Sequence, residues 1–228
     1  RYRTLMTRAL PTEPWGPGRL DAVAMIFNRL TGLDLGKPPG YLIPENIQPA
    51  EAPVRYPFLW NAAVQDQTQW PGFADNGSPI LGLARNLGEV YGVFATFHPR
   101  KDNWRILGVD YSSDNSANFD GLTKLEELVR KLGPPRWPWP VDEAMAAAGK
   151  AIYERPATQG GCNECHGITK GAVRFPDNQT WATPVQNVGT DTREFELLGR
   201  TARSGALEGA RIPFATSPLK PTDTAFNI

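Results

Sequence analysis

The amino-acid sequence predicts a mainly α-helical, loop-rich fold. Apolar residues recur at helical spacing in several separate stretches of the 228 residues. Proline and glycine number 22 each, which is below the level of a low-complexity chain and predicts long ordered loops between modest helices. We expect little sheet, and we find no internal repeat.

The first 79 residues are expected to hold one helix between two loop regions. Residues 1–18 predict an extended arm that ends in a turn rich in proline and glycine. A helix follows, because Leu20, Val23, Phe27 and Leu30 recur at helical spacing and Gly32 is placed to end it. Residues 33–79 predict a long loop whose tryptophans favour packing over something apolar.

Two further helices are expected before residue 140. The stretch from Ile80 to Phe97 has helical periodicity, and its Arg85 and Glu89, four residues apart, could form an exposed ion pair or have a buried functional role. Residues 120–132 predict a helix that is capped by Asp120 and stopped at Gly133. Its apolar side comprises Leu122, Leu125, Leu128, Val129 and Leu132.

A stiff proline- and tryptophan-rich connector at 136–140 predicts a domain boundary, with one loop-rich helical domain at 1–140 and another domain at 141–228. In the second domain, Asp142 is placed to cap a helix with Glu143 in its first turn. A loop is expected to about residue 190. A short helix over 191–203, with Asp191 and Glu194 at capping-box-like spacing, and a coil complete the chain.

The most specific chemical signal is the sequence Cys162-Asn163-Glu164-Cys165-His166. Cys-x-x-Cys-His is the covalent attachment motif of a c-type haem. Each thiol can form a thioether to one vinyl group of the porphyrin, and the adjacent imidazole can bind the iron on its proximal side. The sequence therefore predicts one covalently attached haem c, with His166 as an iron ligand.

Three other interpretations of the motif are weaker. A zinc site has only His98 as a further histidine and no further cysteine, so its ligand set is incomplete. A thioredoxin-like dithiol needs a strand–helix setting, whereas the flanking sequence is rich in Gly, Asn and Thr. A disulfide between Cys162 and Cys165 would close too small a loop to stabilise the fold much.

The distal iron ligand is left open. A class I cytochrome c usually supplies a methionine after the motif, but no Met or His follows His166 here. His98 is the second histidine of the chain and could be the distal ligand, although a lone histidine is more often a helix-terminal or surface residue. Water, Lys170 or a ligand from another segment are further options.

Charge and hydropathy restrict the partners and the location. The formal net charge is zero, so no electrostatic reason exists to bind nucleic acid or an anionic membrane. No transmembrane helix is expected, because no apolar run approaches 18 residues. The chain opens on Arg1 and has no signal-peptide pattern, which favours a mature or truncated form. Since bacteria attach haem c outside the cytoplasm, a periplasmic or other extracytoplasmic location is expected.

The segment before the motif resembles the opening helix of a class I cytochrome c domain. Gly149 and Tyr153 lie four residues apart, and Gly167 follows the motif. The resemblance implies that the glycine lets another helix cross closely and that Tyr153 packs near the haem edge. It also implies a cytochrome c-like haem domain, with Tyr153 and Gly167 among the haem-binding residues.

Several stretches together resemble the di-haem c-type proteins related to bacterial rubber oxygenase, which are distantly similar to di-haem cytochrome c peroxidases. The matching stretches are 16–22, 52–61, 69–70, 84–94, 125–126 and 137–138, followed by the haem motif. The resemblance implies a mostly helical protein with two haem domains, of which this chain resembles the C-terminal portion. The family's first haem motif and its Tyr-Leu-His-Asn-Gly-Ser-like segment are absent here.

Two functions follow as hypotheses. The first is a c-type cytochrome with one haem that transfers single electrons to a redox protein partner, alone or within a larger complex. The alternative is a fragment or subunit of a di-haem oxygenase or peroxidase, which needs an open iron site. The sequence does not decide whether the chain is an enzyme.

Overall fold

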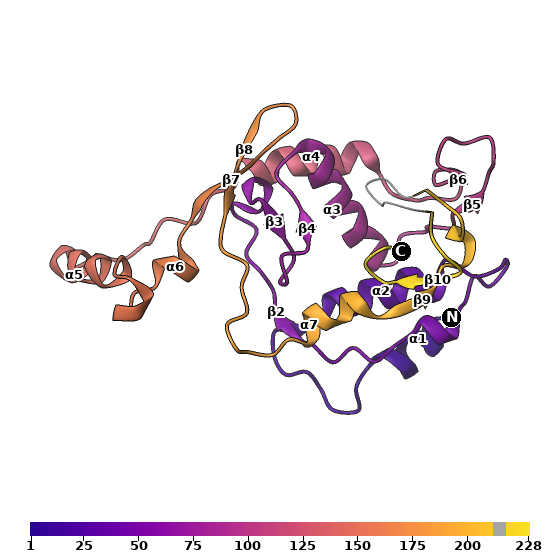
Figure 1. Ribbon diagram of the computed structural model, residues 1–228, viewed down its shortest axis with the longest axis horizontal. Helices are drawn as coiled ribbons and strands as arrows, with labels where there is room; N and C mark the ends of the chain where they lie inside the picture. The colour runs from indigo at the N-terminus through magenta and orange to yellow at the C-terminus, as the bar shows by residue number, and fades with distance from the viewer. Residues whose placement is uncertain (212–217) are drawn as a thin grey trace. The chain divides into compact units, whose positions relative to one another are not determined.

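The computed structural model describes residues 1–211 and 218–228, and its elements are mixed rather than mainly α-helical (Figure 1). Over the described residues, 36% are helical and 14% are in strands, and the strands form five small two-stranded antiparallel sheets. The predicted fold class is therefore wrong, and a clear cytochrome c fold is not seen.

The strands were missed because most of them are too short to show a periodic pattern. Four of the five sheets contain strands of only two or three residues, and a strand needs several alternating residues before its period can be read. The fifth sheet is a hairpin of β7 (Thr169–Arg174) and β8 (Asn178–Ala182). Its strands flank a Pro-Asp sequence that is typical of turns, so a signal for this hairpin was present.

The described chain divides into two units, each built from segments that are distant in sequence. Unit 1 comprises Arg1–Pro57, Asn86–Phe119 and Asp191–Ile228, and unit 2 comprises Phe58–Arg85 and Asp120–Thr190. The sequence-based boundary at residue 140 stays a prediction.

Unit 1 contains the apolar core. Its helices are α1 (Tyr2–Ala9), α2 (Ala22–Leu33) and α7 (Arg193–Glu196). Its sheets pair β1 (Arg19–Leu20) with β2 (Val54–Arg55), β5 (Arg100–Lys101) with β6 (Val109–Asp110), and β9 (Thr201–Arg203) with β10 (Thr222–Thr224). One buried cluster joins α1 to α2 through Leu5, Ala9, Leu33 and Ile47. A second consists of Leu35, Ile43, Val109, Leu207, Ala210 and Leu219.

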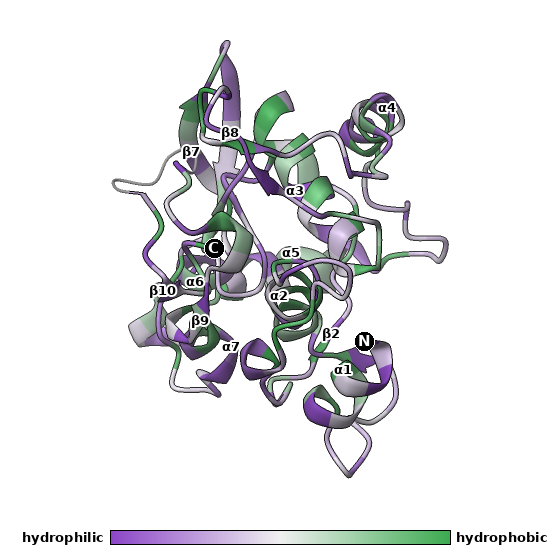
Figure 2. Cartoon of the chain, turned by 90° about the vertical axis from the view of Figure 1, so that its right-hand side faces the viewer, coloured by the Kyte–Doolittle hydropathy of each residue, from purple (hydrophilic) through white to green (hydrophobic). Residues whose placement is uncertain are grey.

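The first two helices show one prediction confirmed and one wrong. The helix at 20–32 is confirmed as α2, whose N-cap Asp21 accepts a hydrogen bond from the Ala24 amide, and Figure 2 shows its largely hydrophobic colouring. Residues 1–18 do not form an extended arm throughout, because α1 forms before the first proline. Leu5 and Ala9 lie four residues apart on α1 and are fully buried, which stabilises this short helix.

Unit 2 has a polar centre. It contains β3 (Gln67–Thr68) paired with β4 (Ala74–Asp75), the helices α4 (Phe119–Arg130), α5 (Glu143–Tyr153) and α6 (Asn163–His166), and the β7–β8 hairpin, with α4 beginning at the last residue of unit 1. Helix α3 (Pro79–Gly92) begins in this unit and ends in unit 1. The fully buried residues Asn76 and Thr180 lie in unit 2, and Ala63 is the buried hydrophobic residue among those described there.

Helices α3 and α4 lie where helices are predicted, although α4 begins at Phe119, one residue before the predicted cap Asp120. The predicted helix at 80–97 ends at Gly92, where an added Cβ would lie 2.3 Å from Ile26. In α4 the expected apolar side is largely exposed, with Leu125 and Leu128 at 49% and 63%, whereas Glu126 is buried. The helical periodicity identifies the apolar face of α4, whereas the face that is buried carries an ion pair.

The chain after residue 190 also differs from expectation. The expected helix over 191–203 is replaced by the four-residue α7, a 3-10 turn (Leu197–Gly199) and β9. Thr192 is the N-cap of α7 and its side chain makes no capping hydrogen bond, so the predicted capping box is absent. Part of the predicted terminal coil, 212–217, lies outside the described residues; the rest includes a 3-10 turn (Gly205–Leu207) and β10.

Candidate functional site

Helix α5 begins as the sequence predicts. The Asp142 carboxylate accepts a hydrogen bond from the Met145 amide at 3.0 Å, and Glu143 lies in the first turn. An anionic side chain there satisfies a free amide and is favoured by the helix dipole. No residue of α5 is buried, so packing within the described chain contributes little to this helix.

A tight glycine turn connects α5 to the motif. Gly160 has φ +76°, a conformation that glycine adopts without strain. At Gly161 a Cβ would lie 1.7 Å from the carbonyl oxygen of Arg155, so any side chain would force the backbone apart. Both glycines therefore let the chain reverse within a few residues of the end of α5.

Two hydrogen bonds hold the motif against the end of α5. The Cys162 amide donates to the Tyr153 carbonyl oxygen at 3.0 Å, and the Tyr153 hydroxyl donates to the His166 carbonyl oxygen at 2.7 Å. Figure 1 shows the resulting arrangement, in which α6 follows α5 closely. Tyr153 is thus hydrogen-bonded to the first and the last residue of the motif.

The motif itself is a single helical turn. The His166 amide donates to the Cys162 carbonyl oxygen at 2.9 Å, and the Gly167 amide donates to the Asn163 carbonyl oxygen at 2.7 Å. A Cβ on Gly167 would lie 2.2 Å from that same oxygen, which explains the glycine after the histidine. The Glu164 carboxylate accepts from the Ala157 amide at 2.9 Å and ties the turn to the preceding segment.

The reactive side chains of the motif are accessible. Both cysteines are free thiols; Cys162 is exposed and Cys165 is half-buried, and His166 is exposed. The side-chain amide of Gln186 donates to the Cys165 sulfur at 2.8 Å. Sequence reasoning missed Gln186, because a residue 21 positions away has no spacing signal.

One face of α5 presents apolar atoms that the described residues leave exposed. Met145, Gly149, Ile152 and Tyr153 share this face by helical spacing, and the side chains of Met145 and Ile152 are 72% and 44% exposed. A Cβ on Gly149 would meet nothing within 4 Å, so the close helix crossing that the cytochrome c resemblance implies is not seen among the described residues.

His98 lies in unit 1 and contacts carboxylates through both ring nitrogens. Its Nδ1 is 3.1 Å from Asp114 and its Nε2 is 3.5 Å from Asp34, while Tyr41 stacks on the ring at 3.7 Å between centroids. Asp34 is fully buried and also pairs with Arg29; burial raises the pKa of Asp34 despite the nearby Arg29 guanidinium. These contacts favour a structural role for His98, and its role as an iron ligand stays a prediction.

Arg85 has a buried structural role in unit 2. It forms an ion pair with Glu126, and its guanidinium donates to the Asn76 side chain at 2.6 Å. The Asn76 amide in turn donates to the carbonyl oxygens of Ala62 and Gln65 at 2.7 and 2.8 Å. The interpretation of Arg85 as part of an exposed ion pair is therefore wrong.

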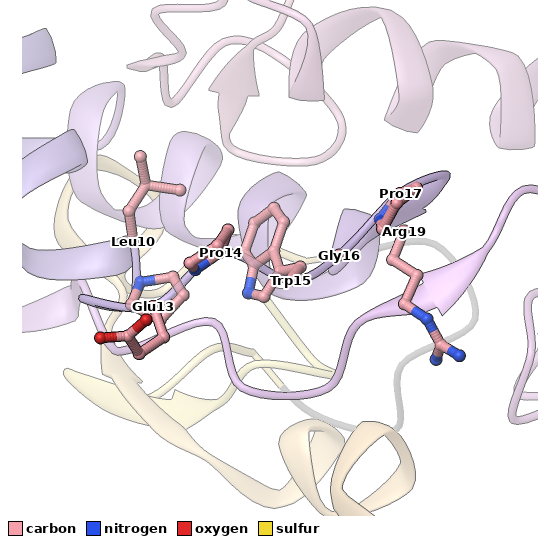
Figure 3. A pocket seen from close by; sticks show the side chains of 8 residues that line it. Leu10, Glu13, Pro14, Trp15, Gly16, Pro17 and Arg19 are labelled. Atoms are coloured by element: carbon pink, nitrogen blue, oxygen red, sulfur yellow. The ribbon is translucent and has the colours of Figure 1, made fainter.

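Other candidate sites offer less chemistry. Within the described ranges, no three or more His, Cys, Asp or Glu side chains come together to hold a metal ion. An open groove of about 490 Å³ is lined by residues between Leu10 and Arg19 and includes none of the predicted site residues (Figure 3). Lys170 lies in β7 and is exposed.

No family model matches the chain, and no solved structure matches it. A protein of Sinorhizobium fredii (strain NBRC 101917 / NGR234), the uncharacterized protein y4iJ, is 27% identical over 206 residues. The match covers 80% of the chain and 32% of y4iJ, so the chain spans about a third of the length of this relative. The similarity identifies a relative without a known activity.

The described residues include no helix that is both long enough and apolar enough to cross a lipid bilayer.

Proposed function

We propose that the chain is a c-type cytochrome module that holds one haem covalently and exchanges single electrons with a redox protein partner. Cys162 and Cys165 would form the two thioether bonds, and His166 would bind the iron on the proximal side. When bound, the haem supplies a one-electron Fe(III)/Fe(II) couple. The single observation that supports this proposal most is the exposed Cys-x-x-Cys-His turn braced at both ends by Tyr153.

The residues around the motif fit a flat apolar group. The α5 face with Met145 and Ile152 is exposed, and Ile168 just beyond the motif is 65% exposed. Exposed apolar side chains that gather on a protein surface often mark a binding site. Ala63 is the buried hydrophobic residue among those described in unit 2, so a covalently held porphyrin would add apolar contacts that this unit lacks.

The chain's own residues would orient the iron ligand. The hydrogen bond from the Tyr153 hydroxyl fixes the His166 carbonyl oxygen, and the helical turn fixes the spacing from Cys162 to His166. A rigid proximal backbone limits the rearrangement that accompanies a change of iron charge, which favours electron transfer. The redox partner would be a protein, alone or within a larger complex, and a periplasmic or other extracytoplasmic location follows from haem c attachment.

The test is expression of the chain in a bacterium that has a cytochrome c maturation system. We expect a pyridine haemochrome spectrum of haem c in a ratio of one haem per chain, with the haem retained under denaturing electrophoresis. The Cys162→Ala, Cys165→Ala double variant should lose covalent haem. A wild-type protein without covalent haem would overturn the proposal.

Carbon monoxide then separates electron transfer from the oxygenase or peroxidase alternative. A six-coordinate low-spin haem that is indifferent to carbon monoxide would support electron transfer, because the distal position is then filled. A high-spin haem that binds carbon monoxide would instead favour the enzyme, since its substrate needs an open position.

A further inference from the structure

The loop after β8 is anchored beside the haem motif by a glycine contact. Gly72 has φ +69°, and a Cβ there would lie 2.8 Å from a methyl group of Val185, so the glycine leaves room for this side chain. The Gly72 amide donates to the Gln69 carbonyl oxygen at 2.9 Å, which closes the turn that receives Val185. Val185 therefore lies against this turn, although its side chain is 62% exposed.

The next residue, Gln186, contacts one of the two motif cysteines. Its side-chain Nε2 donates to the Cys165 sulfur at 2.8 Å. Cys165 is half-buried, whereas Cys162 is exposed. The two thiols therefore differ in environment, and Gln186 supplies part of that difference.

We infer that Gln186 is a positioning residue that keeps the Cys165 thiol reduced and oriented for haem attachment. The inference rests on the proposed function. In the attachment step, the thiol S–H bond breaks, sulfur bonds to one vinyl carbon and the hydrogen goes to the other. This addition releases no group and has no net oxidant or reductant.

The competing reaction is oxidation of the two thiols to a disulfide. With glutathione disulfide as oxidant, one sulfur–sulfur bond forms between Cys162 and Cys165, and two glutathione thiols are released. A disulfide sulfur accepts a hydrogen bond more weakly than a thiol or thiolate sulfur. Oxidation therefore weakens the bond from the Gln186 amide to Cys165, so this bond stabilises the dithiol relative to the disulfide.

The test measures this equilibrium in the full chain without haem. The protein is equilibrated with mixtures of reduced and oxidised glutathione, free thiols are alkylated, and the disulfide fraction is quantified by mass spectrometry. In Gln186→Ala, the equilibrium constant for disulfide formation should rise about two- to fivefold, the range for one exposed hydrogen bond. Gln186→Glu keeps the size but removes the donor and should shift the constant in the same direction.

The matched control is Asn187→Ala, which removes a neighbouring amide side chain that accepts from the Gly189 amide. Its equilibrium constant should equal that of the wild type, and circular dichroism should show that all variants are folded. An unchanged constant in both Gln186 variants would overturn the inference. This measurement needs no haem, so its result can overturn the inference about Gln186 without affecting the proposed function. The proposed function is overturned by a different result, a missing haem c spectrum.

A second readout uses the haem-loaded protein. If Gln186 orients Cys165, the Gln186→Ala protein should contain more haem bound through Cys162 alone, detected in tryptic peptides. A general loss of structure would lower attachment at both cysteines equally, so the ratio separates positioning from stability. An unchanged ratio would count against the inference.

Discussion

The Tyr153 hydroxyl donates to the carbonyl oxygen of His166 at 2.7 Å, across 13 residues of sequence. The same tyrosine accepts a hydrogen bond from the Cys162 amide through its backbone. A single substitution, Tyr153→Phe, removes the side-chain hydrogen bond and keeps the backbone bond and the ring. This substitution therefore separates the role of the hydroxyl from that of the aromatic ring.

Tyr153→Phe should destabilise the motif while leaving haem attachment possible. The lost hydrogen bond is partly exposed, so we expect a cost of about 0.5–1 kcal/mol. Chemical denaturation of the haem-loaded protein, followed at the haem absorption band, measures it. Tyr56→Phe, at an exposed tyrosine of unit 1, is the control and should leave the midpoint unchanged. Equal midpoints for wild type and Tyr153→Phe would show that the bond contributes nothing.

Substitution by alanine should have opposite effects at Gly161 and at Gly149. At Gly161 the new Cβ would lie 1.7 Å from a backbone oxygen, so the turn must open and the yield of covalent haem should fall severalfold. At Gly149 a Cβ meets nothing within 4 Å, so alanine should preserve the yield and stabilise α5 by up to about 1 kcal/mol. A loss of haem in Gly149→Ala would instead reveal a close contact on that face once haem is bound.

His98→Ala should lower stability without changing the iron. The ring lies between Asp34 and Asp114 and stacks on Tyr41, so its removal leaves buried Asp34 with one partner fewer. We expect a loss of about 1–2 kcal/mol, measured by urea unfolding. The visible spectrum should keep its spin state. A change from low spin to high spin would show that His98 is the distal ligand.

In α4, a buried charge should matter more than exposed leucines. Glu126 is 5% exposed and pairs with Arg85, so Glu126→Ala leaves a buried guanidinium without this partner and should cost about 3–5 kcal/mol. Leu128→Ala, at a side chain that is 63% exposed, should cost less than about 1 kcal/mol. Thermal unfolding of the two variants compares them directly. A larger loss in Leu128→Ala would mean that another surface covers this face of α4.

The sequence predicts local helix caps and helix positions well, and contacts between residues distant in sequence poorly. Asp142 as a helix cap and the helix positions of α2 and α4 follow from spacing and capping rules that act over a few residues. The Gln186–Cys165 and Arg85–Glu126 contacts join residues 21 and 41 positions apart, and no local pattern indicates them.

The β7–β8 hairpin was missed for a different reason. Its strands contain mostly polar and small residues, and buried Thr180 lies where an apolar residue would normally reveal the inner face. Asp66 binds Thr180 at 2.9 Å and Arg174 at 3.1 Å, so polar contacts replace the hydrophobic alternation on which strand prediction depends.

Glu194 should make the stability of the chain depend on pH near neutrality. Burial, with a contribution from nearby Asp21, raises the pKa of this carboxyl to about 7. The folded state then binds a proton more tightly than the unfolded state, whose carboxyl titrates near 4.5. Protonated Glu194 stabilises the folded state fully below about pH 4.5. This contribution to the free energy of unfolding, at most about 3 kcal/mol, is lost as the pH rises to about 7.

Glu194→Gln, which stays neutral, should flatten the dependence of the free energy of unfolding on pH, measured by urea unfolding from pH 4.5 to 8. Glu208→Gln, at an exposed glutamate, is the control and should keep the wild-type slope. An unchanged slope in Glu194→Gln would show that another group causes the pH dependence.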